Sequence, residues 1–151
     1  CVGSDKPSQK VNTPYVNAHD IKQLMATVME PQADIFWGAA GSRYDATGLH
    51  DLRPTSDAEW LTTRSAAATV AEIGNLLMTP LFAEGRGEDW IQFSRSLVEV
   101  GKKAEKAAVD RDESAIMEVG MTMYRVCSAC HEAYPPVEAA STATPPSPAP
   151  P

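Results

Sequence analysis

Long hydrophobic runs are missing from this sequence of 151 residues. No apolar stretch approaches the roughly 20 residues that a transmembrane helix needs, which argues against a membrane-spanning chain. Positive charge is also scarce, because 13 Lys and Arg are outnumbered by 20 Asp and Glu, for a net charge of −7. Such a chain is poorly suited to bind nucleic acid, or to adhere to anionic lipid by charge alone. Its 43% hydrophobic residues instead predict one globular domain.

Cysteine is rare, and two of the three residues lie in the motif Cys127-Ser128-Ala129-Cys130-His131. C-x-x-C-H is the attachment signature of a c-type haem. On a helix, residues three and four apart are neighbours, so Cys127, Cys130 and His131 would share one face. The two thiols would form thioethers with one covalent haem c, and the adjacent imidazole would point at its iron.

Three other interpretations of the motif are a redox dithiol, half of a zinc site and an accidental match. A redox dithiol usually sits at the start of a helix after a strand, and no strand pattern precedes Cys127. A zinc site needs a second ligand pair, and the sequence has no other Cys-x-x-Cys and no His-x-x-x-His. The haem interpretation is therefore favoured.

The third cysteine is Cys1. The sequence starts with Cys rather than Met, and covalent haem attachment takes place outside the cytoplasm. Haem attachment there would require export, and a mature sequence that begins with Cys resembles a bacterial lipoprotein cleaved before an acylated cysteine. A free thiol and an arbitrary first residue are the alternatives. We expect lipidation of Cys1, periplasmic location and anchoring to a bacterial membrane. Residues 1–16 would form the tether.

Helical periodicity and capping signals predict an all-α chain of four helices. The first would begin near Asn17, pass a kink at Pro31 and end near Gly41, followed by a loop over 42–55. The second would start at the capping box of Ser56 and Glu59. Its predicted inner face and stop are Leu61, Ser65, Ala68, Thr69, Ile73, Leu76 and Leu77, then Pro80.

The third helix would follow Gly85-Arg86-Gly87, and the fourth would run from about 110–113 through the haem motif to Tyr134. Residues 135–151 hold seven of the twelve prolines and form a Pro-rich tail. The tail is by default a free end, but it could dock the chain to a membrane complex. One basic cluster comprises Lys102, Lys103, Lys106 and Arg111. It would either dock an acidic partner or be a solvated helix face.

This organisation resembles the class II cytochromes c, which include cytochrome c′ and the low-spin cytochrome c556 type. The resemblance covers roughly residues 17–134. Residues 127–134 match the family's C-x-x-C-H-x-x-aromatic ending, and Leu24-Met25 with 38–41 match its first helix in spacing. Asp89-Trp90-Ile91 opens the third helix as the family often does. The family commonly has Arg or Lys after the aromatic, where this chain has Pro135.

The resemblance implies an antiparallel four-helix bundle over 17–134 with a covalently bound c-type haem on the last helix. Cys127 and Cys130 would hold the haem, Tyr134 would pack on it, and His131 would be the proximal ligand of its iron. Met25 falls at the distal position, where a Met ligates iron in the low-spin members. Plain core packing is the alternative for Met25, and Met29 is the next candidate ligand. His19 and His50 are expected at the surface.

Three functions are compatible with these residues. The leading one is a non-enzymatic, monohaem one-electron carrier with His131 and Met25 as iron ligands and redox proteins as partners. The second is a five-coordinate cytochrome c′-like protein that binds nitric oxide or carbon monoxide. The third is a lipid-anchored haem subunit of a larger membrane electron-transfer complex. The family also suggests a homodimer through the first two helices.

Overall fold

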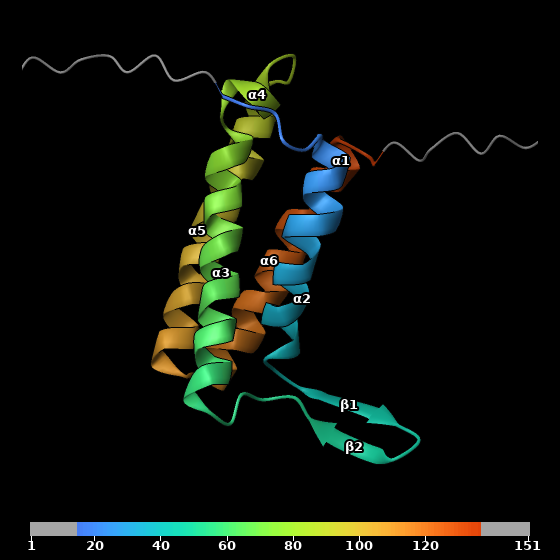
Figure 1. Ribbon diagram of the computed structural model, residues 1–151, viewed down its shortest axis with the longest axis vertical. Coiled ribbons are helices and arrows are strands. Elements are labelled where there is room, and N and C mark those ends of the chain that lie inside the picture. Colours follow the sequence, from blue (N-terminus) through green and yellow to red (C-terminus); the bar gives the residue numbers. More distant parts are fainter. Residues whose placement is uncertain (1–14, 137–151) are drawn as a thin grey trace, which may run out of the picture.

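The computed structural model describes residues 15–136, which are mostly helical with one small two-stranded sheet (Figure 1). The first helix is divided by a π turn, in which backbone hydrogen bonds reach five residues rather than four. The elements are α1 Ile21–Leu24, the π turn η1 Met25–Met29, α2 Glu30–Gly38, β1 Ser42–Asp45, β2 Gly48–Asp51, α3 Asp57–Leu77, α4 Pro80–Ala83, α5 Glu88–Asp110 and α6 Glu113–Ala133.

The long helices run side by side, each in the opposite direction to the one before it (Figure 1). Helices α3 and α5 approach most closely. A Cβ atom built at Gly101 of α5 would lie 2.6 Å from the backbone nitrogen of Ala71 in α3. One built at Gly74 would lie 2.8 Å from the backbone oxygen of Ser94. Glycine at these two positions therefore permits the close packing of α3 on α5.

The start of α6, the hairpin and the end of α2 lie at one end of the molecule. The start of α1, the short helix α4 and the end of α6 lie at the other (Figure 1). Between them, the core is built from side chains of every long helix. Phe36, Val70, Ile116 and Met123 are its largest fully buried members. The mostly helical fold predicted from the sequence is thus confirmed.

Capping chemistry explains where the helices begin. Ser56 and Glu59 form the predicted capping box of α3. The first helix, however, is capped by Asp20 and not by Asn17. The carboxylate of Asp20 accepts a hydrogen bond from the backbone N–H of Gln23 (2.8 Å), whose side chain accepts one in return from the backbone of Asp20 (3.1 Å). Asp20 thus completes a reciprocal cap.

The predicted inner face of α3 is confirmed at Ile73 and Leu77, which are buried, but wrong at Leu61 and Ser65, which are exposed. Leu61, assigned to the core, is 60% exposed, whereas its neighbour Trp60 is buried. The helix is flanked by both α2 and α5, so its small residues form a wide buried surface. Pro80 also does not stop α3, which ends at Leu77; Pro80 starts α4 instead, as the fixed φ of proline favours.

The segment expected to be a loop over 42–55 contains the hairpin β1–β2, in which Tyr44 pairs with Leu49. Its turn is held by Asp45, whose carboxylate accepts hydrogen bonds from the backbone N–H (2.8 Å) and hydroxyl (2.6 Å) of Thr47. Gly48 closes the turn with φ +121. His50 also contacts Asp45, at 3.0 Å. The hairpin projects from the helices (Figure 1), and Tyr44 is 81% exposed.

Candidate haem site

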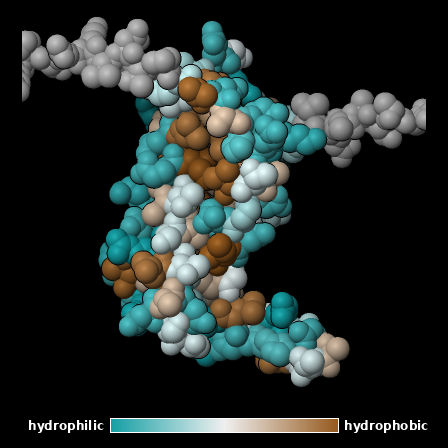
Figure 2. Space-filling model, viewed as in Figure 1, coloured by the Kyte–Doolittle hydropathy of each residue, from teal (hydrophilic) through white to brown (hydrophobic). Residues whose placement is uncertain are grey.

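A cavity of about 730 Å³ opens where η1, the turn before α5 and the end of α6 meet. Its volume lies within the range of roughly 300–1,000 Å³ that is typical of ligand and cofactor sites. Figure 2 shows hydrophobic side chains gathered toward this end of the molecule. The cavity is lined by Asp20, Ile21, Lys22, Met25, Ala26, Glu30, Arg86, Trp90, Cys130, His131, Ala133, Tyr134, Pro135 and Pro136.

The C-terminal end of α6 contributes Cys130, His131 and Tyr134 to the cavity wall. The helix is capped at its start by Asp112 and ends just before the two prolines, as predicted. Cys127 lies one turn earlier, is half-buried and packs against the core. It is not among the cavity-lining residues, so the structure brings only part of the motif to the cavity surface.

The π turn contributes Met25, the first residue of η1, whose side chain is partly buried, to the lining of the same cavity. Met29, the other candidate ligand, is only 6% exposed and belongs to the hydrophobic core. Met25 alone of the six methionines borders the cavity. His19 is exposed, and neither it nor His50 is a lining residue.

Tyr134 fastens the end of α6 to the start of α5. Its hydroxyl donates to the carboxylate of Asp89 (2.7 Å), and its ring meets Trp90 edge to face with 5.0 Å between centroids. Trp90 is fixed in turn, because its indole N–H donates to the carbonyl of Leu77 (2.7 Å). These contacts join the last turn of α6 to the start of α5 and, through Trp90, to the end of α3.

Charged groups of both signs line the cavity. Lys22 and Arg86 are the cations, and Asp20 and Glu30 are the anions. The guanidinium of Arg86 lies 4.3 Å from the centroid of the Trp90 ring, a cation–π contact, and also donates to the carbonyl of Phe82. Arg86 is therefore held in place at the cavity wall.

The two thiols are held in their neutral form. Burial, followed by the proximity of Cys130, raises the pKa of Cys127 to about 11. Burial is also the main cause of the raised pKa of Cys130, with a smaller contribution from Asp89. The hydrogen bond to Asp89 raises the pKa of Tyr134, because the neutral phenol is the donor. Neither thiol has the depressed pKa of a reactive redox cysteine.

The side chains that line this cavity are of the chemical types that hold a c-type haem. A thiol, an imidazole and a thioether border one cavity, and Ile21 and Trp90 add apolar surface suited to a flat ring. Lys22 and Arg86 are cations of the kind that pair with haem propionates. Among residues 15–136, no group of three His, Cys, Asp or Glu side chains is arranged to hold a bare metal ion.

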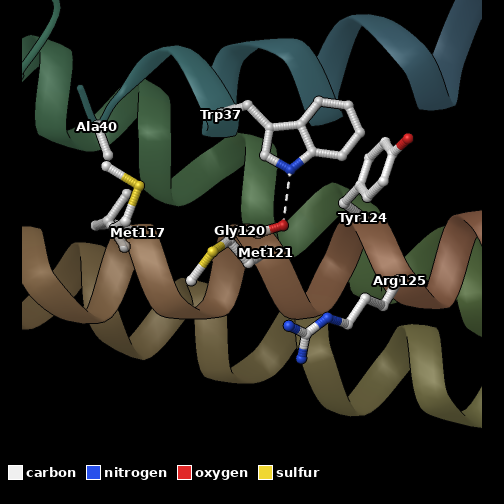
Figure 3. Close-up of a pocket in the computed structure, with 8 residues that line it drawn as sticks. Trp37, Ala40, Met117, Gly120, Met121, Tyr124 and Arg125 are labelled. Atoms are coloured by element: carbon white, nitrogen blue, oxygen red, sulfur yellow. Dashed lines mark hydrogen bonds between the residues drawn. The ribbon is translucent and has the colours of Figure 1, made fainter. Parts of the chain in front are cut away.

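A second hollow of about 510 Å³ lies between α2 and α6 (Figure 3). The indole N–H of Trp37 donates to the carbonyl of Gly120 (3.0 Å), and the ring meets Tyr124 edge to face. Met117 and Met121 complete an apolar wall. This hollow contains neither a motif residue nor a histidine, so the cavity at Met25 remains the candidate haem site.

Sequence reasoning did not place Arg86 and Lys22 at the cavity, and it did not predict the Asp89–Tyr134 hydrogen bond. Arg86 lies between two glycines, a pattern that indicates only a turn. Its proximity to Trp90, only four positions later, was the available signal. Two of the four residues of the predicted basic cluster form ion pairs, Lys106 with Asp110 and Arg111 with Asp57 (2.6 Å). Lys102 and Lys103 remain exposed.

Within the part of the chain that the structure describes, no helix combines the length and apolar character required to cross a membrane. Residues 1–14 and 137–151 lie outside it, so the predicted lipidation of Cys1, the tether and most of the Pro-rich tail do as well. Comparison of the chain with protein-family models, with curated proteins and with solved structures found no match.

Proposed function

We propose that this chain is a monohaem c-type cytochrome of the antiparallel four-helix-bundle type, acting as a one-electron carrier rather than an enzyme. The observation that carries the proposal is the single cavity bordered by Cys130 and His131 from α6 and by Met25 from η1. These elements are distant in the sequence, and the imidazole and thioether donors they bring are the axial ligands typical of electron-transfer haems.

Each residue has a defined part in this proposal. The thiols of Cys127 and Cys130 would each add to a vinyl group of the haem to form the thioethers, and His131 and Met25 would be the two protein ligands of its iron. A bound haem supplies a one-electron iron couple, and a thioether ligand favours its reduced state. Trp90 and Ile21 exclude water, while Tyr134 holds the end of α6 against α5. Arg86 and Lys22 offset the propionate charge in a chain of net charge −7.

Attachment is tested by producing the full chain in a bacterial periplasm with the haem-attachment machinery. We expect a mass increase of one haem that survives denaturation and acid extraction. The double variant Cys127→Ser/Cys130→Ser should lose all covalent haem. A wild-type chain that acquires no covalent haem under conditions that load a control cytochrome c would refute the proposal.

Ligation is tested by the spin state of the ferric and ferrous haem, using optical and electron paramagnetic resonance spectroscopy. We expect a low-spin wild type that becomes high-spin in Met25→Leu. Met29→Leu is the matched control, because it changes a neighbouring methionine in the core and should stay low-spin. A high-spin wild type that binds carbon monoxide would favour the five-coordinate alternative, which the open space beside Met25 also permits.

The cellular setting is part of the same proposal. We expect a periplasmic protein with acylated Cys1, tested by mass spectrometry of protein from native membranes; an unmodified thiol there would refute the anchor. Docking of the Pro-rich tail to a membrane complex predicts that deletion of 137–151 abolishes co-purification. Unchanged co-purification would leave soluble redox proteins, or a second copy of this chain, as the partners.

A further inference from the structure

The π turn η1 begins at Met25, the proposed distal ligand. The backbone N–H of Glu30 donates to the carbonyl of Met25, five residues back instead of four. Such turns accommodate one extra residue within a helix and often occur at functional sites. Met25 is the first residue of this turn and borders the cavity.

The extra residue changes which side chains enter the core. The buried positions of this helix are Leu24, Met29, Ala33 and Phe36, so the steps between them are five, four and three. In an unbroken α-helix, the position four before Met29 is Met25, and Met25 would then take the core site that Leu24 occupies. The π turn instead leaves Met25 about 100° further round, on the cavity side.

Two residues weaken the α-helical alternative at this turn. Pro31 has no N–H to donate to the carbonyl of Thr27, and its ring would clash with that carbonyl in a regular helix. Thr27 itself donates from its hydroxyl to the carbonyl of Gln23 (2.6 Å), a bond that tends to loosen and bend helices. Both effects act on the segment where the π turn is observed.

From this geometry we infer that Pro31 is a positioning residue, which by maintaining the π turn directs Met25 into the haem cavity instead of the core. The inference rests on the proposed function for its meaning, since it identifies what brings the distal ligand to the haem. Ala26 already lines the cavity beside Met25. Without the π turn, Ala26 would move to the position that Met25 now holds, and a methyl group cannot ligate iron.

The test uses the haem-loaded full chain and two variants. Pro31→Ala restores the missing N–H and should let the helix rewind, so the low-spin signature of Met25 ligation should be lost. Combining Pro31→Ala with deletion of Ala26 removes the extra residue as well. That helix can be regular while Leu24 stays in the core and Met25 on the cavity side, so low-spin ligation should return. An undisturbed low-spin spectrum in Pro31→Ala would overturn the inference.

A second measurement does not depend on haem. In the full chain produced without haem, Met25 should be oxidised by peroxide faster than the core residue Met29, as followed by peptide mass spectrometry. In Pro31→Ala, the oxidation rate of Met25 should fall to that of Met29; an unchanged rate would refute the role of Pro31 even if no haem attaches. Far-ultraviolet circular dichroism establishes that each variant is folded. If Met25 in Pro31→Ala is oxidised as fast as Met25 in the urea-unfolded chain, that result counts against the inference.

Discussion

The crossing of α3 and α5 allows a stability prediction at Gly101. A methyl group there would lie 2.6 Å from the backbone nitrogen of Ala71, 2.8 Å from its Cα and 2.9 Å from its Cβ. None of these atoms belongs to a flexible side chain, so the two helices must move apart. Overpacking of this kind costs about 1–3 kcal/mol. Alanine recovers up to about 1 kcal/mol of helix propensity.

For Gly101→Ala we expect a net loss of about 1–2 kcal/mol, since the backbone clash outweighs the propensity gain. In a chain of this size, that loss lowers the melting temperature by roughly 2–8 °C. Gly38→Ala is the matched control, because no atom lies within 4 Å of its added methyl group. It should leave stability unchanged or slightly higher. Thermal unfolding by circular dichroism compares them, and a Gly101→Ala variant as stable as wild type would refute the packing argument.

Two further predictions concern the haem end of α6. Tyr134→Phe removes the donor to Asp89 but keeps the ring on Trp90, so stability should fall by at most about 1 kcal/mol. Amide exchange over 127–134 should nevertheless accelerate, and unchanged exchange would contradict the role of this hydrogen bond. In the haem-free chain, the raised pKa of Cys127, about 11 against an ordinary 9.0, predicts slow alkylation at pH 8 that accelerates toward pH 11. Equal rates in folded and urea-unfolded protein would contradict it. Because the unfolded thiol ionises first, folding stability should decrease as the pH rises from 9 toward 11, and Cys127→Ser should remove this contribution.

Local chemistry made much of the fold predictable. The capping box at Ser56 and the prolines after Tyr134 act on their immediate neighbours, and both ends lie where the sequence indicates. The motif likewise predicts which helix carries Cys130 and His131. Each of these signals is complete within a few residues, so no tertiary information was needed to interpret it.

The hairpin and the orientation of α3 depend on contacts that are not local. The strands are four residues long and largely exposed, so they show no apolar alternation to distinguish them from a loop. On α3, apolar and small residues occur nearly all round the helix, and the close approach of α5 at Gly74 and Gly101 decides which of them are buried. Leu61 and Trp60 are adjacent in sequence, but packing against the neighbouring helices buries only Trp60.

Two different features of the sequence bring residues to the candidate haem site, one on α6 and one on the first helix. On α6, the adjacent motif residues Cys130 and His131 reach the cavity because both lie in the last turn of the helix. The position of Met25 depends on the phase of the first helix, which one extra residue in η1 changes by about 100°. Under the proposed function, a chain with the same C-x-x-C-H motif but a regular first helix would place Ala26 where Met25 now borders the cavity, and the haem would lack its proposed second ligand. The choice between an electron carrier and a gas-binding haem would then depend on Pro31, six positions after the methionine that it directs.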